Sequence, residues 1–243
     1  MTAKYNVFDR VCYNGEDIGV VNSWDFPIMV GNVFSNNLFH AGSGGMTGRF
    51  CAYLDNSTGT EFSSNILYDC GHGVVSNGNR DNYVHDNVII NTDDSDTPIE
   101  VRDGGTVITQ EAGRTGDFSE VLANHNYIEW KAFVDRVAAN PDLRALIAER
   151  VPHLLTYTAD ITRWSEPEFV LNIVVDVTGN RYLNPTAKTY EYSDALKLFG
   201  NYEGNVGYTL DENPLFVNPA IGDYRIREGV DFPDIEFEKI GRY

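Results

Sequence analysis

The chain has 243 residues, with 36 acidic against 18 basic side chains and a formal net charge of −18 at pH 7. This length suits one large domain or two small ones, and so negative a charge argues against binding to nucleic acids or anionic membranes. The longest apolar runs are too short to span a bilayer, and Met1–Arg10 lacks the apolar segment of a signal peptide. We therefore expect either a cytosolic protein or a mature or excised piece of a secreted one.

The first 105 residues contain a repeat in which a polar residue and an Asn precede a short apolar run. Its copies are Ser35–Phe39, Ser64–Tyr68 and Asp86–Ile90, and their Asn residues are separated by 28 and 22 residues. Such a period predicts a parallel β-solenoid, in which each coil buries its apolar side only by stacking on its neighbours. Asn at a turn tolerates the left-handed region, and stacked Asn side chains can form hydrogen bonds from coil to coil. A β-sandwich with accidental repetition is the alternative.

Residues 117–168 interrupt this pattern with apolar residues at steps of three and four. They predict two helices at 117–139 and 141–150, with Asn140 as N-cap and Pro141 in the first turn. A helical excursion from a solenoid either covers a binding groove or only shields apolar surface, and both readings stay open. Strand character returns at 169–175, and the segment from Asn213 onward reads as an extended strip that covers the last coil.

Three cysteines, Cys12, Cys51 and Cys70, have no spacing typical of a metal site. They are most simply explained as buried small apolar residues, with a disulfide or a reactive thiol as the alternatives. His40 follows an apolar strand and precedes a glycine-rich loop, from where it can reach a groove. A loop histidine without a ligand is the alternative.

Several segments resemble the right-handed parallel β-helix proteins of the pectate-lyase-like group, and most closely the branch that includes glycoside hydrolase family 141. The likeness rests on Ala52–Asn56, Gly78–Asn82, Asn213–Pro219 with Gly222–Arg225, and the terminal Phe237–Tyr243. It covers nearly the whole chain. Asn56 and Asn79 depart from the family's pattern, in which a second Asp and a Gly are common. Members are commonly longer, so the chain resembles a C-terminal portion or a minimal version, with the signal peptide and upstream coils absent.

The resemblance implies an all-β fold, a right-handed parallel β-helix (solenoid) with an α-helical insertion and an extended C-terminal strip. As one structural domain it would comprise β-helix coils at 1–116, the helical insertion at 117–168, and final coils with the tail at 169–243. It also implies a secreted or periplasmic protein that acts on carbohydrates. An uncapped N-terminal coil would be a route to self-association.

Hydrolysis of a glycosidic bond usually needs two carboxyl groups, one to donate a proton and one to act as base or nucleophile. Asp55 and Asp81 are the candidates for catalysis, with Asp55 one coil earlier and offset along it by about four residues. A uniform coil of 22 residues would stack Arg80 and Asp81 on Arg102 and Asp103. Such a stack either shifts the proton affinity of one Asp or is only a salt-bridge ladder. The remaining candidates bind substrate, namely Asp17, His40, Tyr53, Arg80, Arg102 and Asp103.

The sequence thus predicts a carbohydrate-active β-helix protein that hydrolyses glycosidic bonds in a poly- or oligosaccharide without a cofactor. A polysaccharide lyase acting by β-elimination is an alternative, and its charge neutralisation would call for calcium. The acidic turn with Asp93, Asp94 and Asp96 is either a calcium site or a solvated turn, since it lacks the EF-hand pattern. A non-catalytic glycan-binding or structural fragment is the other alternative. Only five Lys or Arg occur in residues 1–105, which favours a neutral glycan over a polyanionic one.

Overall fold

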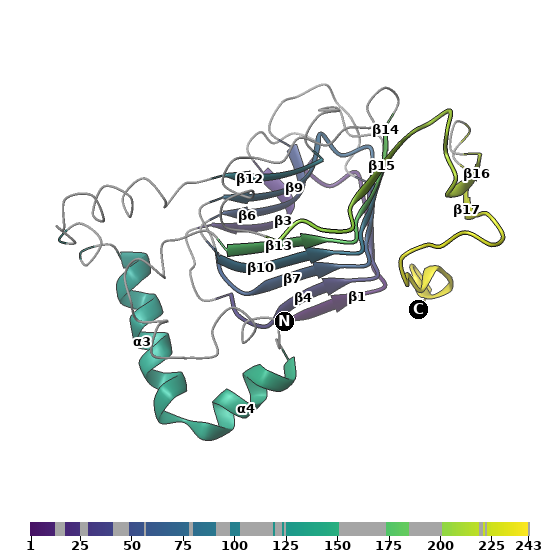
Figure 1. The fold of residues 1–243 in the computed structure, drawn as a ribbon. Coiled ribbons are helices and arrows are strands. Elements are labelled where there is room, and N and C mark those ends of the chain that lie inside the picture. Colours follow the sequence, from purple (N-terminus) through teal and green to yellow (C-terminus); the bar gives the residue numbers. More distant parts are fainter. Residues whose placement is uncertain are drawn as a thin grey trace.

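The computed structural model describes residues 1–12, 18–24, 29–40, 49–55, 57–77, 80–90, 98–102, 119, 123, 125–150, 174–184, 201–218, 221 and 223–242. Within these ranges the chain is mostly β, and its three larger sheets are parallel. Each strand in these sheets pairs mainly with the strand three places along the chain, so we call three consecutive strands, one from each sheet, a layer. Figure 1 shows the layers stacked on one another.

Sheet A has the order β1-β4-β7-β10-β13, with strands Thr2–Lys4, Asn32–Ser35, Thr60–Ser63, Arg80–His85 and Val174–Thr178. Sheet B has the order β2-β5-β8-β11-β14-β15, with strands Val7–Asp9, Leu38–His40, Ile66–Tyr68, Val88–Ile90, Arg181–Asn184 and Val206–Thr209. Sheet C has the order β3-β6-β9-β12, with strands Ile18–Trp24, Arg49–Asp55, His72–Asn77 and Ile99–Arg102.

The core lies where the inward side chains of the three sheets meet. It contains Phe34, Phe62, Val84 and Val177 from sheet A, Phe39, Leu67 and Ile89 from sheet B, and Ala52, Leu54, Val74 and Ile99 from sheet C. All are buried, and Phe39, Phe62 and Leu67 are completely inaccessible. The short β-branched and aromatic runs of the sequence repeat are therefore the strands that fill this core.

An asparagine ladder forms the corner between sheets A and B in every described layer. The amide oxygens of Asn37, Asn65, Asn87, Asn180 and Asn205 each accept hydrogen bonds from the backbone N–H and the side-chain amide of the preceding ladder Asn, at 2.9–3.1 Å. The predicted coil-to-coil Asn bonding is confirmed. The left-handed residue, however, is the one before each Asn, with φ between 52° and 74° at Tyr5, Asn36, Ser64, Asp86, Gly179 and Gly204.

Two helices lie between β12 and β13 in the chain, α3 (His125–Ala139) and α4 (Pro141–Arg150). Asn140 caps α4, since its amide oxygen accepts a hydrogen bond from the backbone N–H of Leu143 at 3.1 Å. The predicted bounds of α4 and the end of α3 are confirmed. The predicted start at 117, the boundary at 168 and most of the predicted strand 169–175 lie outside the described residues.

Two of the three cysteines form a disulfide, Cys51–Cys70, and both are completely buried. The simplest prediction, three buried thiols, is therefore replaced by its alternative. The bond joins β6 to the residue pair after β8. By chain entropy, closing a loop of this size stabilises the fold by about 3 kcal/mol. Cys12 is free and partly exposed.

The C-terminal segment does not close the last layer, as the sequence suggested, but runs back along the outer face of sheet B. It begins with the antiparallel pair β16 (Phe216–Asn218) and β17 (Asp223–Ile226) and includes the short 3-10 helix η3 (Phe237–Lys239). Leu215, Phe216 and Ile235 pack on the outward side chains of sheet B. The N–H groups of Glu236 and Gly241 bond to Asn36 and Tyr5, which belong to the first two layers. Figure 1 shows this segment beside the stack.

Candidate functional site

Asp55 lies at the centre of a column formed by the last residues of the four strands of sheet C. Trp24 of β3 pairs with Asp55, Asp55 pairs with Asn77 of β9, and Asn77 pairs with Arg102 of β12. Neighbouring strands are ~4.8 Å apart, so the column is about 14 Å long. It brings together an aromatic residue, a carboxylate, an amide and a cation at one edge of the sheet.

The Asp55 carboxylate is 8% exposed as a residue and accepts a 2.6 Å hydrogen bond from the Asn77 side-chain amide. An amide donor orients a carboxylate and favours its ionised form. That is the form required of a base or nucleophile in glycoside hydrolysis. Sequence reasoning missed Asn77, although its separation of 22 residues from Asp55 equals the repeat and could have revealed it.

Asp81 lies in a different sheet from Asp55, near the start of β10. It has φ 56° and occupies a register shift between Arg80 and Asn82. Only 1% of Asp81 is exposed. The predicted offset of four residues is confirmed, because Asp55 pairs with Asn77, four residues before Asp81. The burial of Asp81 indicates a structural contribution at this bulge.

The predicted stacking of Arg80 on Arg102 is wrong. Arg102 pairs with Asn77 in sheet C, whereas Arg80 pairs with Val174 in sheet A. The reason is the length of the layers: Asp55 to Asn77 is 22 residues, but Asn77 to Arg102 is 25. Three extra residues shift the register, so one period cannot be applied across both steps. Asp17 and Asp103 lie outside the described residues.

The other predicted substrate-binding residues are spread over the molecule. Tyr53 of β6 is 7% exposed, and its ring packs on Phe50 with 4.6 Å between ring centroids, which explains it as a packing residue. His40 ends β5 in sheet B, where Nδ1 lies 2.6 Å from a carboxylate oxygen of Asp9 and the ring stacks on Tyr68. The hydrogen bond from His40 lowers the pKa of Asp9. His40 thus links two layers and does not share a sheet with Asp55.

A second polar cluster, which sequence reasoning missed, lies on sheet A. His85 of β10 contacts Asp86 through Nδ1 at 2.7 Å and Glu61 of β7 through Nε2 at 3.5 Å, and it stacks on Tyr83 with centroids 3.7 Å apart. Burial and the nearby charge of Asp176 raise the pKa of Tyr83. The signal was again the 22-residue step, which separates Glu61 from Tyr83 and Ser63 from His85.

Neither cluster is a metal centre by its donor arrangement. Among the described residues, no three or more His, Cys, Asp or Glu side chains are grouped so as to hold a metal ion. The acidic turn at Asp93–Asp96 lies outside those residues. No helix in the described part of the chain is long and apolar enough to cross a membrane.

Comparison with models of known protein families, with curated proteins and with solved structures finds no match to this chain.

Proposed function

We propose that the chain is a right-handed parallel β-helix protein that binds a poly- or oligosaccharide and hydrolyses its glycosidic bonds with Asp55. The fold proposal is supported by three parallel sheets whose strands recur in threes and by the continuous asparagine ladder. The buried Cys51–Cys70 disulfide supports an oxidising, secreted setting.

One observation carries the functional proposal, namely the Trp24–Asp55–Asn77–Arg102 column. An aromatic residue next to a carboxylate suits a sugar, because its ring offers apolar surface to the sugar face. The Asn77 amide holds the carboxylate in position, and Arg102 supplies a fixed positive charge one strand further on. In this assignment Asp55 acts as base or nucleophile, and Asp81 is the second carboxylate proposed from the sequence.

A non-catalytic glycan binder is the second candidate, and the burial of the two carboxylates favours it. Asp81 is 1% exposed and Asp55 only 8%, whereas a catalytic carboxylate must reach the bond that it cleaves. A binder needs no such access, because the column edge and its aromatic residue would be sufficient to hold a neutral glycan.

The substitution Asp55→Asn separates these candidates. It keeps the size of the side chain and an oxygen that accepts from Asn77, so we expect loss of turnover with little change in melting temperature. Asp135→Asn on the exposed face of α3 is the matched control and should leave turnover intact. A fully active Asp55→Asn enzyme would exclude Asp55 as the catalytic carboxylate. Glycan binding without cleavage by the unmodified chain would favour the binder.

A further inference from the structure

The two ends of the stack differ in how well their cores are covered. In the last layers the inward residues Val175, Val177 and Tyr182 are at most 3% exposed. In the first layer the inward residues Ala3, Phe8 and Val20 are only partly buried. The first layer therefore leaves core surface accessible at the end of the stack formed by β1, β2 and β3.

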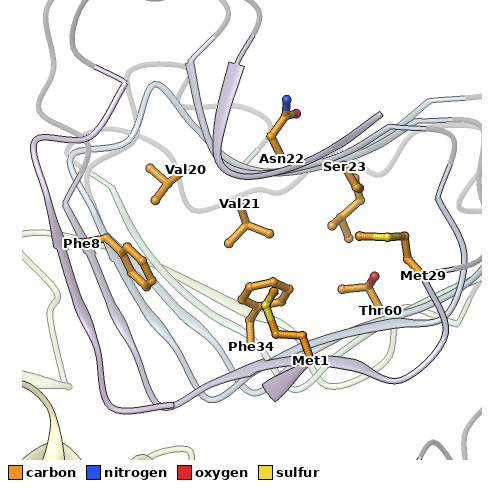
Figure 2. Close-up of a pocket in the computed structure, with 10 residues that line it drawn as sticks. Met1, Phe8, Val20, Val21, Asn22, Ser23, Met29, Phe34 and Thr60 are labelled. Carbon is orange, nitrogen blue, oxygen red and sulfur yellow. The ribbon is translucent and has the colours of Figure 1, made fainter. Parts of the chain in front are cut away.

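A cavity of about 200 Å³ opens at this end. Its lining comes from all three sheets and consists mainly of apolar side chains, including Phe8, Val20, Val21, Phe34 and Leu54. Figure 2 shows Phe8, Val21 and Phe34 pointing into the same space, with Met1 and Met29 at its side. Exposed apolar surface of this kind is the usual mark of an interaction site.

The same end presents unpaired strand edges. Strands β1, β2 and β3 are the terminal strands of sheets A, B and C, and no described strand pairs with their outer edges. In β2, Asn6 and Arg10 make the backbone bonds to β5, at Leu38 and His40. Because N–H and C=O groups alternate in direction along a strand, those of Val7 point to the open edge.

We propose that this end pairs with the same end of a second copy of the chain in a twofold-symmetric dimer. A partner must offer strand edges at three sides of an apolar centre, and the β1–β2–β3 end itself has this arrangement. A twofold axis perpendicular to the stacking direction sets β1 antiparallel to its counterpart and β2 antiparallel to β3 of the other copy. Such an interface is self-complementary and closes on itself.

The charges at this end fit like-with-like association. The chain as a whole carries −18, so two copies repel each other over most of their surfaces. The described residues of the first layer, in contrast, contain only Lys4, Asp9 and Arg10 as charged side chains. In the twofold arrangement Lys4 lies opposite Thr2 of the other copy, and Asp9 lies opposite β3, whose residues are uncharged. No like charges are directly opposed.

A matched pair of substitutions tests the dimer. Val7 and Val206 occupy the same column of sheet B at its opposite ends, with exposures of 47% and 38%. A lysine on an edge strand disfavours edge pairing. We expect Val7→Lys to weaken self-association by about tenfold or more and Val206→Lys to leave it unchanged. The measurement is molar mass by light scattering over a range of concentrations.

The unmodified chain should show twice its mass of 27.2 kDa, and Val7→Lys should move towards the single mass. A monomer at every concentration, equal weakening by both substitutions, or masses growing beyond two copies would overturn the proposal. If Val7→Lys does not fold, hydrogen exchange on the unmodified chain decides instead. The dimer requires the Val7 amide to gain protection as concentration rises, and a Val7 amide that exchanges equally fast at all concentrations excludes it.

Discussion

His85 shows how one side chain can couple the stability of the stack to pH. Its side chain is 17% exposed and lies between the carboxylates of Asp86 and Glu61. Burial lowers the pKa of His85, but the two carboxylates outweigh it, and the pKa is raised above its ordinary value. The folded protein therefore holds the proton more tightly than the unfolded chain does.

The sign of the pH effect follows from this shift. A raised pKa in the folded state adds stability that is fully present below the unfolded pKa of about 6.5 and is lost as pH rises through the folded pKa. We expect His85→Gln to lower the melting temperature more at pH 5.5 than at pH 8.5, which thermal melts at both pH values would measure. An equal loss at both values would show that His85 contributes through packing alone.

The catalytic candidates themselves could be selected from the sequence, but their surroundings could not. Asp55 and its offset from Asp81 follow from the repeat, and the structure confirms the offset. Arg102 was assigned to the wrong neighbour because the layer that ends at β12 is three residues longer than the one before it. A register shift of this kind moves every later contact, and one sequence without relatives does not reveal it.

At the scale of elements, the asparagine ladder is the feature that the sequence predicted best. Asn residues before short apolar runs identify the corner between sheets A and B, since an Asn can bond both to the backbone and to the next Asn. The end of α3 and the bounds of α4 were also predictable, because Asn140 and Pro141 are local signals. The path of the C-terminal segment was not, because docking on sheet B depends on distant contacts such as Glu236 with Asn36.

The ladder should be most sensitive in its interior. Asn65 is completely buried, accepts bonds from Asn37 and donates to Phe34 and Asn87. Removing its amide leaves several buried partners unsatisfied, at about 1–3 kcal/mol each. We expect Asn65→Ala to lower the free energy of unfolding by at least about 2 kcal/mol in denaturant titrations.

Asn6→Ala, at the exposed end of the same ladder, is the matched control and should cost less. The Asn6 side-chain amide donates to Lys4 and Asn37 in a partly exposed setting, where water can replace the lost partner. Equal losses for the two substitutions would mean that the ladder does not act as a buried, cooperative element.

At the scale of the whole molecule, charge and architecture together narrow the ligand. A chain with −18 net charge repels polyanions unless cations intervene, so a neutral glycan is the substrate class that we propose. Its length along the Trp24–Arg102 column would follow the stacking direction of sheet C. The open β1–β2–β3 end lies elsewhere in the fold, so self-association and glycan binding are separate properties with separate tests.

The most direct test of the central claim is the chemistry of the products. The chain would be incubated with a panel of neutral polysaccharides, and new reducing ends would be quantified together with ultraviolet absorbance. Hydrolysis predicts new reducing ends without an absorbing, unsaturated product. Unsaturated ends that disappear on chelation would instead show β-elimination, and a panel that is bound but never cleaved would contradict enzymatic hydrolysis.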